Sequence, residues 1–447
     1  MAVPQNLADQ EVCVVGLGYV GMTLAVAMAD KGFRVHGLEI NPVVLDALSQ
    51  NRAHFHEPRL DETISRVLRN GRFTFSAELN PSIKAQVYII TVGTPLDKSG
   101  AARLDMVRNA GTQVARHCGD GALVILRSTV KLRTTRDVIG PIFAEHGRKV
   151  DLAFCPERTL EGRALIELTQ IPQIIGADTP EVRIRAAQLF NIMTPTTIQL
   201  SSLEAAELLK LVDNTYRDVS FAFANEIARL CSAAGLSAIE IISAGKFGYP
   251  RTNVAIPGPV GGPCLEKDPH ILTESAKTWG VTMGITSAAR QVNEMQPEES
   301  VGRMAAWAAQ HGNFSKSPKI VICGVAFKGD PPTDDLRGTM AAPILQALKV
   351  AFPQARLFGY DAVVEDEPMR GFGLEPIGEL SAAFDDASIV VIQNNHPVFR
   401  RMDVVALAER MQRPGLIYDF WNLHSPPATE LATDLTYAPL GGERIGV

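Results

Sequence analysis

The sequence lacks long apolar runs, paired cysteines and any excess of positive charge, and each absence excludes a class of protein. No stretch of its 447 residues approaches the roughly 18 unbroken apolar residues of a membrane-spanning helix. Residues 1–10 hold no basic segment followed by an apolar one, as a secretory leader would. A formal net charge of -6 at pH 7 excludes a polycationic face. We therefore expect a cytoplasmic protein that binds neither nucleic acid nor a membrane.

The cysteines occur singly, without a Cys-x-x-Cys pair or a regular spacing. This pattern disfavours a zinc site and a disulfide framework and fits a reducing compartment, so we expect no metal. Hydrophobic residues make up 46% of the chain and charged residues 21%, as in a globular protein, and the length predicts two or three domains. The six cysteines are Cys13, Cys118, Cys155, Cys231, Cys264 and Cys323.

The first forty residues have the pattern of a strand, a glycine-rich turn, a helix and a second strand. Residues 11–15 are apolar, residues 16–21 read Gly-Leu-Gly-Tyr-Val-Gly, and residues 22–30 are alanine-rich and helical in pattern. A second strand is expected at residues 33–38, and it ends at Glu39. A Gly-x-Gly-x-x-Gly turn between a strand and a helix is typical of dinucleotide binding.

Each part of this turn has a physical reason to bind a pyrophosphate. Gly16 permits the tight turn, Gly18 lets the backbone approach the phosphates, and Gly21 lets the helix pack closely. The N-terminus of the helix attracts negative charge. Glu39 stands where an acid bonds a ribose 2′-hydroxyl and repels a 2′-phosphate, which favours NAD over NADP. The alternative is a glycine turn of purely structural use.

Two further strand-like runs, residues 86–92 and 122–126, end in small polar residues. The first ends in Thr-Val-Gly-Thr-Pro at residues 91–95, and the second leads to Ser128 and Thr129. In an open parallel sheet the carboxyl ends of strands line the ligand crevice, so we expect these ends to face the nicotinamide half of the cofactor. Thr129 has a second interpretation, as the cap of a helix.

A long amphipathic run at residues 201–235 predicts one helix, with Ser201 and Ser202 at its head as a cap. Lys210 and Asn214 lie four residues apart and therefore share a face. Most lysines on long helices are solvated. The apolar residues around Lys210 favour a buried helix instead, in which both side chains need polar partners.

The last third of the chain predicts a second α/β unit without a glycine fingerprint, so we expect it to bind something other than the dinucleotide. The expected elements are strands at residues 319–324, 356–360, 389–393 and 416–420 and a helix at residues 341–351.

Residues 261–268 read Gly-Gly-Pro-Cys-Leu-Glu-Lys-Asp and place Cys264 between a glycine pair and Asp268. A nicotinamide cofactor takes a hydride but cannot hold a carbonyl carbon, whereas a thiolate can capture an aldehyde so that a second hydride leaves from the adduct. The combination suggests oxidation past the aldehyde to an acid. The alternatives are an inert cysteine and an aspartate that caps a helix beginning near His270.

Taken together, these motifs resemble the UDP-glucose/GDP-mannose dehydrogenase family, the nucleotide-sugar 6-dehydrogenases, over nearly the whole chain. The matching segments are residues 16–21, Thr91 to Pro95, Ser128 to Val130, Cys155 to Arg158, Glu207 to Asn214, Asn225 with Glu226, Gly261 to Asp268, Gly324 to Lys328, and Asp335 to Arg337.

The resemblance implies an α/β fold of two Rossmann-like, doubly wound parallel-sheet domains joined by a long central helix. An N-terminal NAD-binding domain would span residues 1–200, a central helical dimerisation domain residues 201–300, and a C-terminal UDP-sugar-binding domain residues 301–447. It further implies a homodimer or a higher homo-oligomer whose cofactor is NAD and whose partner is a nucleotide sugar.

The resemblance also implies roles for individual residues. Cys264 would be the nucleophile, Lys210 and Asn214 would stabilise the oxyanion, Asp268 would act with a water as base, and Glu157 would assist thioester hydrolysis. An alternative for Glu157 is a surface ion pair with Arg158. The implied cofactor-binding residues are Gly16, Gly18, Tyr19, Val20, Gly21, Glu39, Thr94, Thr129 and Lys267. The implied substrate-binding residues are Arg158, Arg251, Gly261, Lys328 and Arg337.

Two segments depart from the family pattern. The glycine loop at residues 257–262 is one residue shorter than the usual form, and residues 338–340 read Gly-Thr-Met where a Ser-Pro pair is more usual. The first departure leaves the placement of the loop around the sugar open. The second lies at a helix start, where we expect little change.

The substrate is indicated by Arg158, by Gly162-Arg163 and by residues 248–251, which resemble the branch that oxidises UDP-N-acetylhexosamines. In that branch the arginine matching Arg251 reaches the substrate of the partner subunit, although a plain surface arginine fits the sequence as well. The alternatives are a UDP-glucose or GDP-mannose 6-dehydrogenase, a two-electron dehydrogenase of the hydroxyacid type, and a nucleotide-sugar-binding regulator without catalysis.

Overall fold

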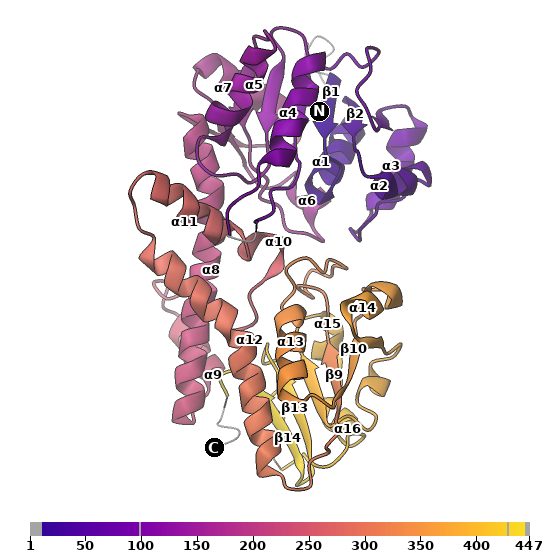
Figure 1. The fold of residues 1–447 in the computed structure, drawn as a ribbon, viewed down its shortest axis with the longest axis vertical. Coiled ribbons are helices and arrows are strands. Elements are labelled where there is room, and N and C mark those ends of the chain that lie inside the picture. The colour runs from indigo at the N-terminus through magenta and orange to yellow at the C-terminus, as the bar shows by residue number, and fades with distance from the viewer. Residues whose placement is uncertain (1–10, 98–99, 427–428, 443–447) are drawn as a thin grey trace. The chain divides into compact units, whose positions relative to one another are not determined.

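The computed structural model describes residues 11–97, 100–426 and 429–442. Its contacts divide the chain into two compact units, shown as ribbons in Figure 1. The N-terminal unit is Met1–Asp213 with His270–Thr282, and the C-terminal unit is Asn214–Pro269 with Met283–Val447. Each unit is built around one sheet.

Among the described residues, the sheet of the N-terminal unit has eight strands in the order β3-β2-β1-β4-β5-β6-β7-β8. The first six are parallel and follow the order of a dinucleotide-binding fold, whereas β7 joins β6 antiparallel. The strands are β1 (Glu11–Val15), β2 (Arg34–Leu38), β3 (Phe73–Ser76), β4 (Val87–Ile90), β5 (Leu123–Leu126), β6 (Asp151–Phe154), β7 (Gln173–Gly176) and β8 (Thr197–Leu200).

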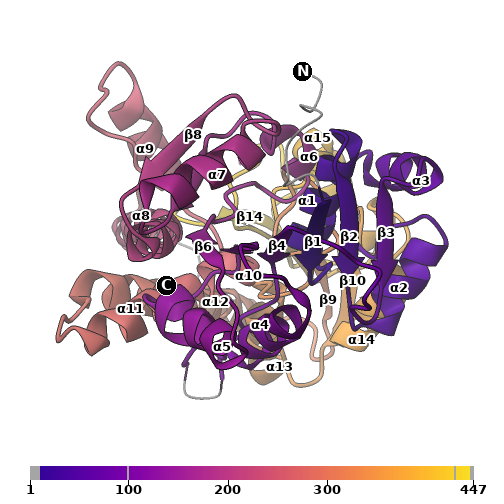
Figure 2. The same cartoon turned by 90° about the horizontal axis from the view of Figure 1, so that it is seen from above.

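Helices cover both faces of this sheet. Figure 2 shows α1 and α7 on one face and α4 and α5 on the other. Two apolar clusters, one on each face, form the core, and the strands β4 and β5 are buried along their whole length. Such continuous apolar strands are expected where a parallel sheet is covered twice. The helices are α1 (Tyr19–Asp30), α2 (Pro42–Ser49), α3 (Leu60–Arg69), α4 (Asp105–His117), η2 (Thr135–Ile139), α5 (Gly140–Glu145), α6 (Ala164–Glu167) and α7 (Pro180–Phe190).

The sheet of the C-terminal unit has six strands in the order β11-β10-β9-β12-β13-β14, all parallel. Relative to the chain this is the same order as the first six strands of the N-terminal unit. The strands are β9 (Lys319–Cys323), β10 (Arg356–Tyr360), β11 (Glu375–Pro376), β12 (Ile389–Ile392), β13 (Gly415–Asp419) and β14 (Leu435–Pro439). The helices are α9 (Ala238–Lys246), α10 (Gly262–Leu265), α12 (Gly284–Gln310), α13 (Ala341–Ala351), α14 (Asp366–Phe372), η3 (Ser381–Ala383), α15 (Pro397–Arg401) and α16 (Val404–Ala408).

Two helices pass from one unit to the other along the chain: α8 (Leu203–Ala234) and α11 (Asp268–Thr278). The expected cap of α8 is confirmed, because the backbone N–H of Ala205 donates to Ser202 Oγ at 3.2 Å. The predicted fold class of two doubly wound α/β domains with a long helix is likewise confirmed.

Some local expectations were wrong. Helix α1 begins at Tyr19, directly after the second glycine of the turn, and not at Met22. Thr129 does not cap a helix, because the next helix, η2, begins at Thr135 after Thr134.

No helix among the described residues has the length and apolar character needed to cross a membrane.

Candidate active site

The glycine-rich turn of the N-terminal unit has the geometry that a bound pyrophosphate needs. Gly16 has a φ of 90°, which favours glycine, and an added Cβ at Gly21 would lie 1.8 Å from the Gly16 carbonyl oxygen. An added Cβ at Gly18 would meet nothing within 4 Å, so the turn is open there. No side chain caps the start of α1, which leaves its first amides available to an anion. These residues therefore fit NAD.

Glu39 is held beside the same turn by two backbone amides. Its Oε2 accepts from the N–H of Leu17 at 2.7 Å, and its Oε1 accepts from the N–H of Asn41 at 2.8 Å. The carboxylate at the end of β2 thus contacts the turn between Gly16 and Gly18. This is the region in which the sequence placed a ribose-binding acid.

The polar ends of β4 and β5 are joined by hydrogen bonds from side-chain hydroxyls. Thr91 Oγ1 donates to the Gly16 carbonyl at 2.7 Å, and Thr94 Oγ1 donates to the Thr129 carbonyl at 2.5 Å. Ser128 Oγ donates to the Val92 carbonyl at 2.6 Å. The carboxyl ends of β1, β4 and β5 therefore form one connected edge, and that this edge faces the nicotinamide stays a prediction.

Glu57 was missed by the sequence analysis, because it lies outside every motif. The Tyr19 hydroxyl donates to its carboxylate, and the N–H of Gly162 donates to Glu57 Oε2 at 2.7 Å and to the Tyr19 hydroxyl oxygen at 3.0 Å. Burial and the Glu57 carboxylate raise the pKa of Tyr19, so this hydroxyl stays protonated. The cluster ties the glycine-rich turn to the segment that carries Arg158 and Arg163.

Glu157 forms a buried ion pair with Arg127, which the sequence analysis also missed. Arg127 Nη2 lies 2.6 Å from Glu157 Oε2, and both side chains are at least nine-tenths buried. The backbone N–H groups of Arg158 and Thr159 each donate to Glu157 Oε1 at 2.7 Å. Burial opposes ionisation, but Arg127 and these amides hold the pKa of Glu157 below its usual value.

The alternative of a surface ion pair between Glu157 and Arg158 is therefore wrong. Arg158 pairs with Asp213 instead, with its Nε 3.0 Å from Asp213 Oδ2. Both of these side chains are partly exposed. Adjacency in sequence suggested the wrong partner, because the buried backbone turn at Glu157 directs its carboxylate toward Arg127.

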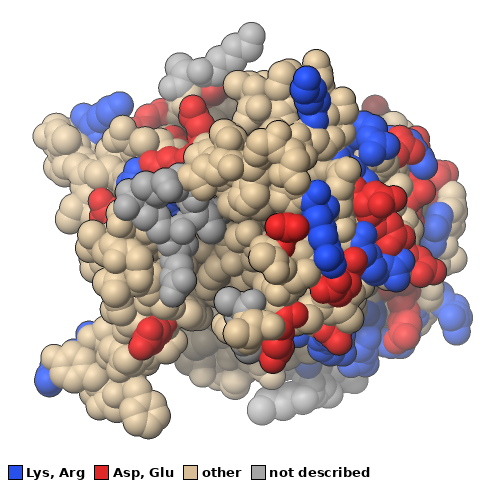
Figure 3. Space-filling view, turned by 90° about the horizontal axis from the view of Figure 1, so that it is seen from below, with Lys and Arg blue, Asp and Glu red and all other residues tan. Residues whose placement is uncertain are grey.

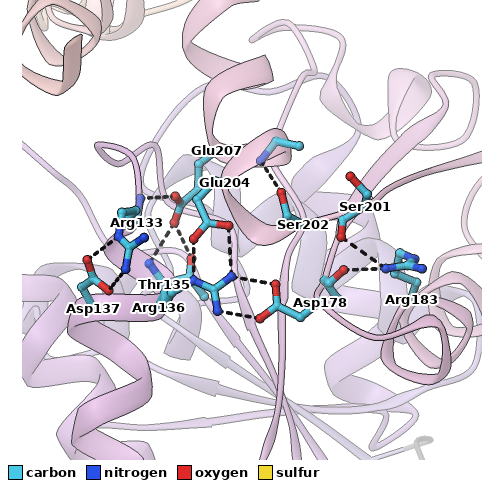
Figure 4. A network of polar contacts seen from close by, with 12 residues as sticks. Arg133, Thr135, Arg136, Asp137, Asp178, Arg183, Ser201, Ser202, Glu204 and Glu207 are labelled. Atoms are coloured by element: carbon cyan, nitrogen blue, oxygen red, sulfur yellow. Dashed lines mark hydrogen bonds and ion pairs between the residues drawn. The ribbon is translucent and has the colours of Figure 1, made fainter. Parts of the chain in front are cut away.

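A polar network holds the first turns of α8 against the segment after β5 (Figure 4). Glu207 is fully buried, and its carboxylate accepts from the N–H of Arg133 at 2.6 Å and from the N–H and hydroxyl of Thr135 at 2.8 and 2.7 Å. Burial raises the pKa of Glu207 to about 7. Arg136 bridges Glu204 and Asp178 nearby. This network fixes the helix one turn before Lys210.

The structure brings Asn214 and Asp268 together. Asn214 Nδ2 donates to Asp268 Oδ2 at 2.6 Å, and Lys267 Nζ lies 2.7 Å from Asp268 Oδ1. Asp268 is completely buried and is the first residue of α11, which begins two residues before the expected start near His270. Lys210 is buried one helical turn before Asn214 on the same face of α8.

Cys264 differs from the other cysteines of the chain by its exposure. It lies in the short helix α10 and is exposed, whereas the other five are buried. Burial raises the pKa of Cys13 and of Cys155 to about 12, so these thiols stay protonated. The inert-cysteine interpretation thus fits the buried residues, and Cys264 is the thiol that solvent or a substrate can reach.

Three of the candidate substrate residues in the C-terminal unit are cationic. Arg337 is exposed, and its guanidinium pairs with Asp335 at 2.6 Å. Lys328 Nζ lies 5.5 Å from the ring centroid of its neighbour Phe327. Arg251 is exposed, with its guanidinium carbon 4.5 Å from the ring centroid of Tyr249.

A sheet whose first helix leaves its amides to a phosphate, followed by a second sheet with the same strand order, is typical of a dinucleotide-binding protein of two Rossmann-like units. Comparison with known families agrees. The chain matches the UDP-glucose/GDP-mannose dehydrogenase family in its NAD binding domain over residues 10–194, its central domain over residues 204–295 and its UDP binding domain over residues 321–426. The protein belongs to this family and is an NAD-dependent nucleotide-sugar dehydrogenase.

Similar proteins include several with different substrates in their names. An NDP-N-acetyl-D-galactosaminuronic acid dehydrogenase of Ralstonia nicotianae is 32% identical over 416 residues, which cover 90% of this chain and 94% of that protein. A UDP-N-acetyl-D-mannosamine dehydrogenase of Pyrococcus horikoshii is 31% identical over 93% of this chain and 96% of that protein. The solved structure of a UDP-glucose dehydrogenase from Pyrobaculum islandicum is 26% identical, with a TM-score of 0.87 over 98% of this chain and 99% of that one.

Proposed function

We propose that the protein oxidises the C6 hydroxyl of a UDP-N-acetylhexosamine to the uronic acid through a cysteine thiohemiacetal and a thioester. The observation that carries this proposal is the exposed Cys264, four residues before a buried Asp268 that Asn214 and Lys267 hold. The names of the curated relatives at about 30% identity support an N-acetylated sugar. The likeness to a UDP-glucose dehydrogenase shows that the backbone alone does not separate the substrates.

Proton removal is assigned to Asp268. Its two carboxylate oxygens are oriented by Asn214 and Lys267, so that the group can accept a hydrogen bond from a water that takes the alcohol proton. NAD, held by residues 16–21 with Glu39, Thr94, Thr129 and Lys267, supplies the hydride acceptor when it is bound. Loss of the first hydride would turn the sugar alcohol into an aldehyde, and the Cys264 thiolate is proposed to attack its carbonyl carbon. The resulting thiohemiacetal would lose a second hydride to a second NAD and become the thioester.

The negative charge that develops on the former carbonyl oxygen needs a cation and a donor. Lys210 and Asn214 are proposed for this role, because both are buried and lie one turn apart on α8. Glu157 is proposed to orient the water that hydrolyses the thioester. Its lowered pKa keeps it ionised at neutral pH, so it acts as a fixed acceptor for a water proton.

The nucleotide sugar is proposed to be recognised by arginine, lysine and backbone groups. A guanidinium gives two parallel donors that suit the diphosphate or a carboxylate. Arg337 and Lys328 supply positive charge in the domain that matches the UDP binding description. The proposed set is Arg158, Arg251, Gly261, Lys328 and Arg337.

We propose a homodimer or a higher homo-oligomer formed along α8. Tyr216, Phe223 and Leu230 lie seven residues apart on this helix and are 67%, 52% and 63% exposed. A seven-residue spacing keeps them on nearly one face. On the face seen in Figure 3, Lys, Arg, Asp and Glu side chains gather over the right of the view, whereas the left is mostly uncharged. A second copy of the helix would cover these side chains.

The substrate is tested by measuring NADH formation with UDP-N-acetylglucosamine, UDP-N-acetylmannosamine, UDP-N-acetylgalactosamine, UDP-glucose and GDP-mannose. We expect kcat/KM for one of the three N-acetylated sugars to exceed that for UDP-glucose by about 100-fold or more, which is about 3 kcal/mol. A Cys264→Ala variant controls for contaminating dehydrogenases. Preference for UDP-glucose or GDP-mannose would contradict the substrate class, and no NADH with any of the five would contradict the proposed reaction.

A further inference from the structure

The loop that carries Cys264 contacts Gly338, which lies three residues before the start of α13 in the same C-terminal unit. The N–H of Gly262 donates to the carbonyl of Gly338 at 2.7 Å. An added Cβ at Gly261 would lie 2.2 Å from that same carbonyl oxygen. The two backbones therefore approach so closely that neither side has room for a side chain at this point.

Two features of Gly338 favour glycine: its backbone conformation and this close contact. Its φ is 61°, in the left-handed region. An added Cβ would lie 2.9 and 3.0 Å from the carbonyl oxygen and carbon of Gly262, and 2.2 Å from Glu266 Oε2. The end of the exposed Glu266 side chain can swing away, but the Gly262 backbone cannot move without moving Cys264, two residues later.

The same loop is fixed at two further points. Gly262 has a φ of 88°, and its added Cβ would lie 2.5 Å from the ring of Phe327. At the other end, the Asn225 side chain donates to the Gly258 carbonyl at 3.1 Å and accepts from the Gly258 N–H at 3.0 Å. A loop held at both ends transmits a displacement at one contact to the residues between and beside the contacts.

We infer that Gly338 is a positioning residue for the nucleophile. Its carbonyl and its missing side chain set the backbone of Gly262 and thereby the direction of the Cys264 thiol. The inference rests on the proposed function, because direction matters only if Cys264 attacks a carbonyl carbon. Arg337, the residue before Gly338, is a proposed substrate-binding residue. One short segment would therefore both bind the substrate and orient the Cys264 thiol.

The test compares Gly338→Ala with Gly235→Ala. Gly235 lies in the same unit with a φ of 70°, and an added Cβ there would meet nothing within 4 Å. The control therefore carries the same backbone strain without the contact. We expect Gly338→Ala to lower kcat by about 10- to 100-fold with KM changed less than about threefold, whereas the control keeps both values. Thermal unfolding of both variants shows whether they fold alike.

A second measurement reads the thiol directly. Iodoacetamide should alkylate Cys264 selectively, because the other five cysteines are buried. The quantity measured is the rate of this alkylation. We expect this rate to change at least about threefold in Gly338→Ala and not in Gly235→Ala. Unchanged alkylation together with unchanged kcat would overturn the inference. Recovery of both values in a Gly338→Ala/Glu266→Ala double variant would also overturn it, because the clash would then involve only the Glu266 side chain.

Two further outcomes remain distinguishable. If Gly338→Ala does not fold, Phe327→Leu loosens the same loop at its other contact and is expected to change the alkylation rate at least about threefold from that of the wild type. An unchanged rate would then overturn the inference. If the wild type forms no NADH from any nucleotide sugar, the proposed function fails. Alkylation still reports whether Gly338 positions the thiol.

Discussion

The turns after the first strand of each sheet are built alike up to one glycine and differ after it. Gly16 and Gly324 have φ angles of 90° and 87°. The N–H of Gly16 donates to the Leu38 carbonyl at 2.8 Å, and the N–H of Gly324 donates to the Tyr360 carbonyl at 2.7 Å. In each case the acceptor is the last residue of the neighbouring strand. The shared strand order therefore comes with a shared way of leaving the first strand.

The two turns then present different groups to a ligand. Helix α1 begins at Tyr19, three residues after Gly16, whereas α13 begins at Ala341, seventeen residues after Gly324. An acid after the neighbouring strand holds each turn: Glu39 Oε2 accepts from the first N–H after Gly16, and Asp361 Oδ2 accepts from the first two after Gly324, at 2.6 and 3.1 Å. One turn thus offers helix amides to a pyrophosphate, and the other is followed by a segment with Lys328 and Arg337. The shared strand order therefore indicates where a ligand binds in each unit, and the residues after the glycine determine which chemical groups contact it.

The largest effect is expected for Gly18→Val. The space beside Gly18 is open in the protein, so the valine should not disturb folding, but it would occupy the path of the phosphates. We expect the Kd for NAD to rise by about 1,000-fold, which is about 4 kcal/mol, with Tm almost unchanged. Calorimetric titration and thermal unfolding measure the two quantities. Gly371→Val, also in open space but in the C-terminal unit, is the control, and equal NAD affinity in Gly18→Val would refute the assignment.

A smaller effect is expected for cofactor choice. Glu39 would meet a 2′-phosphate with like charge, so wild-type kcat/KM with NAD should exceed that with NADP by about 100-fold. Glu39→Ala should reduce this ratio to about 10 or less. Asp361→Asn is the control, because Asp361 holds the equivalent turn of the C-terminal unit. A change in the cofactor ratio in that control would break the comparison between the turns.

The smallest effect concerns Glu207 on α8. The C-terminal unit holds a similarly buried carboxylate, Asp419 at the end of β13, which is also bonded by backbone amides and a hydroxyl. Burial raises the pKa of Glu207 from about 4.5 to about 7. The folded state then binds the proton more tightly than the unfolded state, so stability should fall as pH rises from 4.5 to 7 and stay level above 7.

Glu207→Gln should flatten that pH dependence by about 1 to 3 kcal/mol, measured by urea unfolding at several pH values. Glu204→Gln, one turn earlier, is the matched control. Arg136 lowers the pKa of Glu204, so its contribution is lost only at lower pH. Equal slopes for wild type and Glu207→Gln between pH 4.5 and 7 would show that Glu207 does not titrate there.

The local sequence pattern was enough to predict helices and strands, but it did not predict contacts between residues far apart in the sequence. Helix α13 and strand β10 have the bounds expected from periodicity alone. Arg127 and Glu57 escaped notice because their partners lie 30 and 38 residues away and no spacing rule connects them.

Gly338 illustrates the same limit. The sequence marks residues 338–340 and the short glycine loop as separate departures from the family pattern. The structure shows that Gly338 and Gly262 are in direct contact. The expectation of little change at residues 338–340 stays a prediction, but a side chain at Gly338 would collide with the loop of Cys264.

The central claim is that one chain carries the sugar from alcohol to acid through Cys264. The most direct test is the number of NADH molecules formed per nucleotide sugar consumed, measured to completion with limiting substrate. The account predicts two NADH and a uronic acid, and it predicts that Cys264→Ala loses this turnover by about 1,000-fold or more. One NADH per sugar, with an aldehyde or ketone as the product and normal rates in Cys264→Ala, would contradict it.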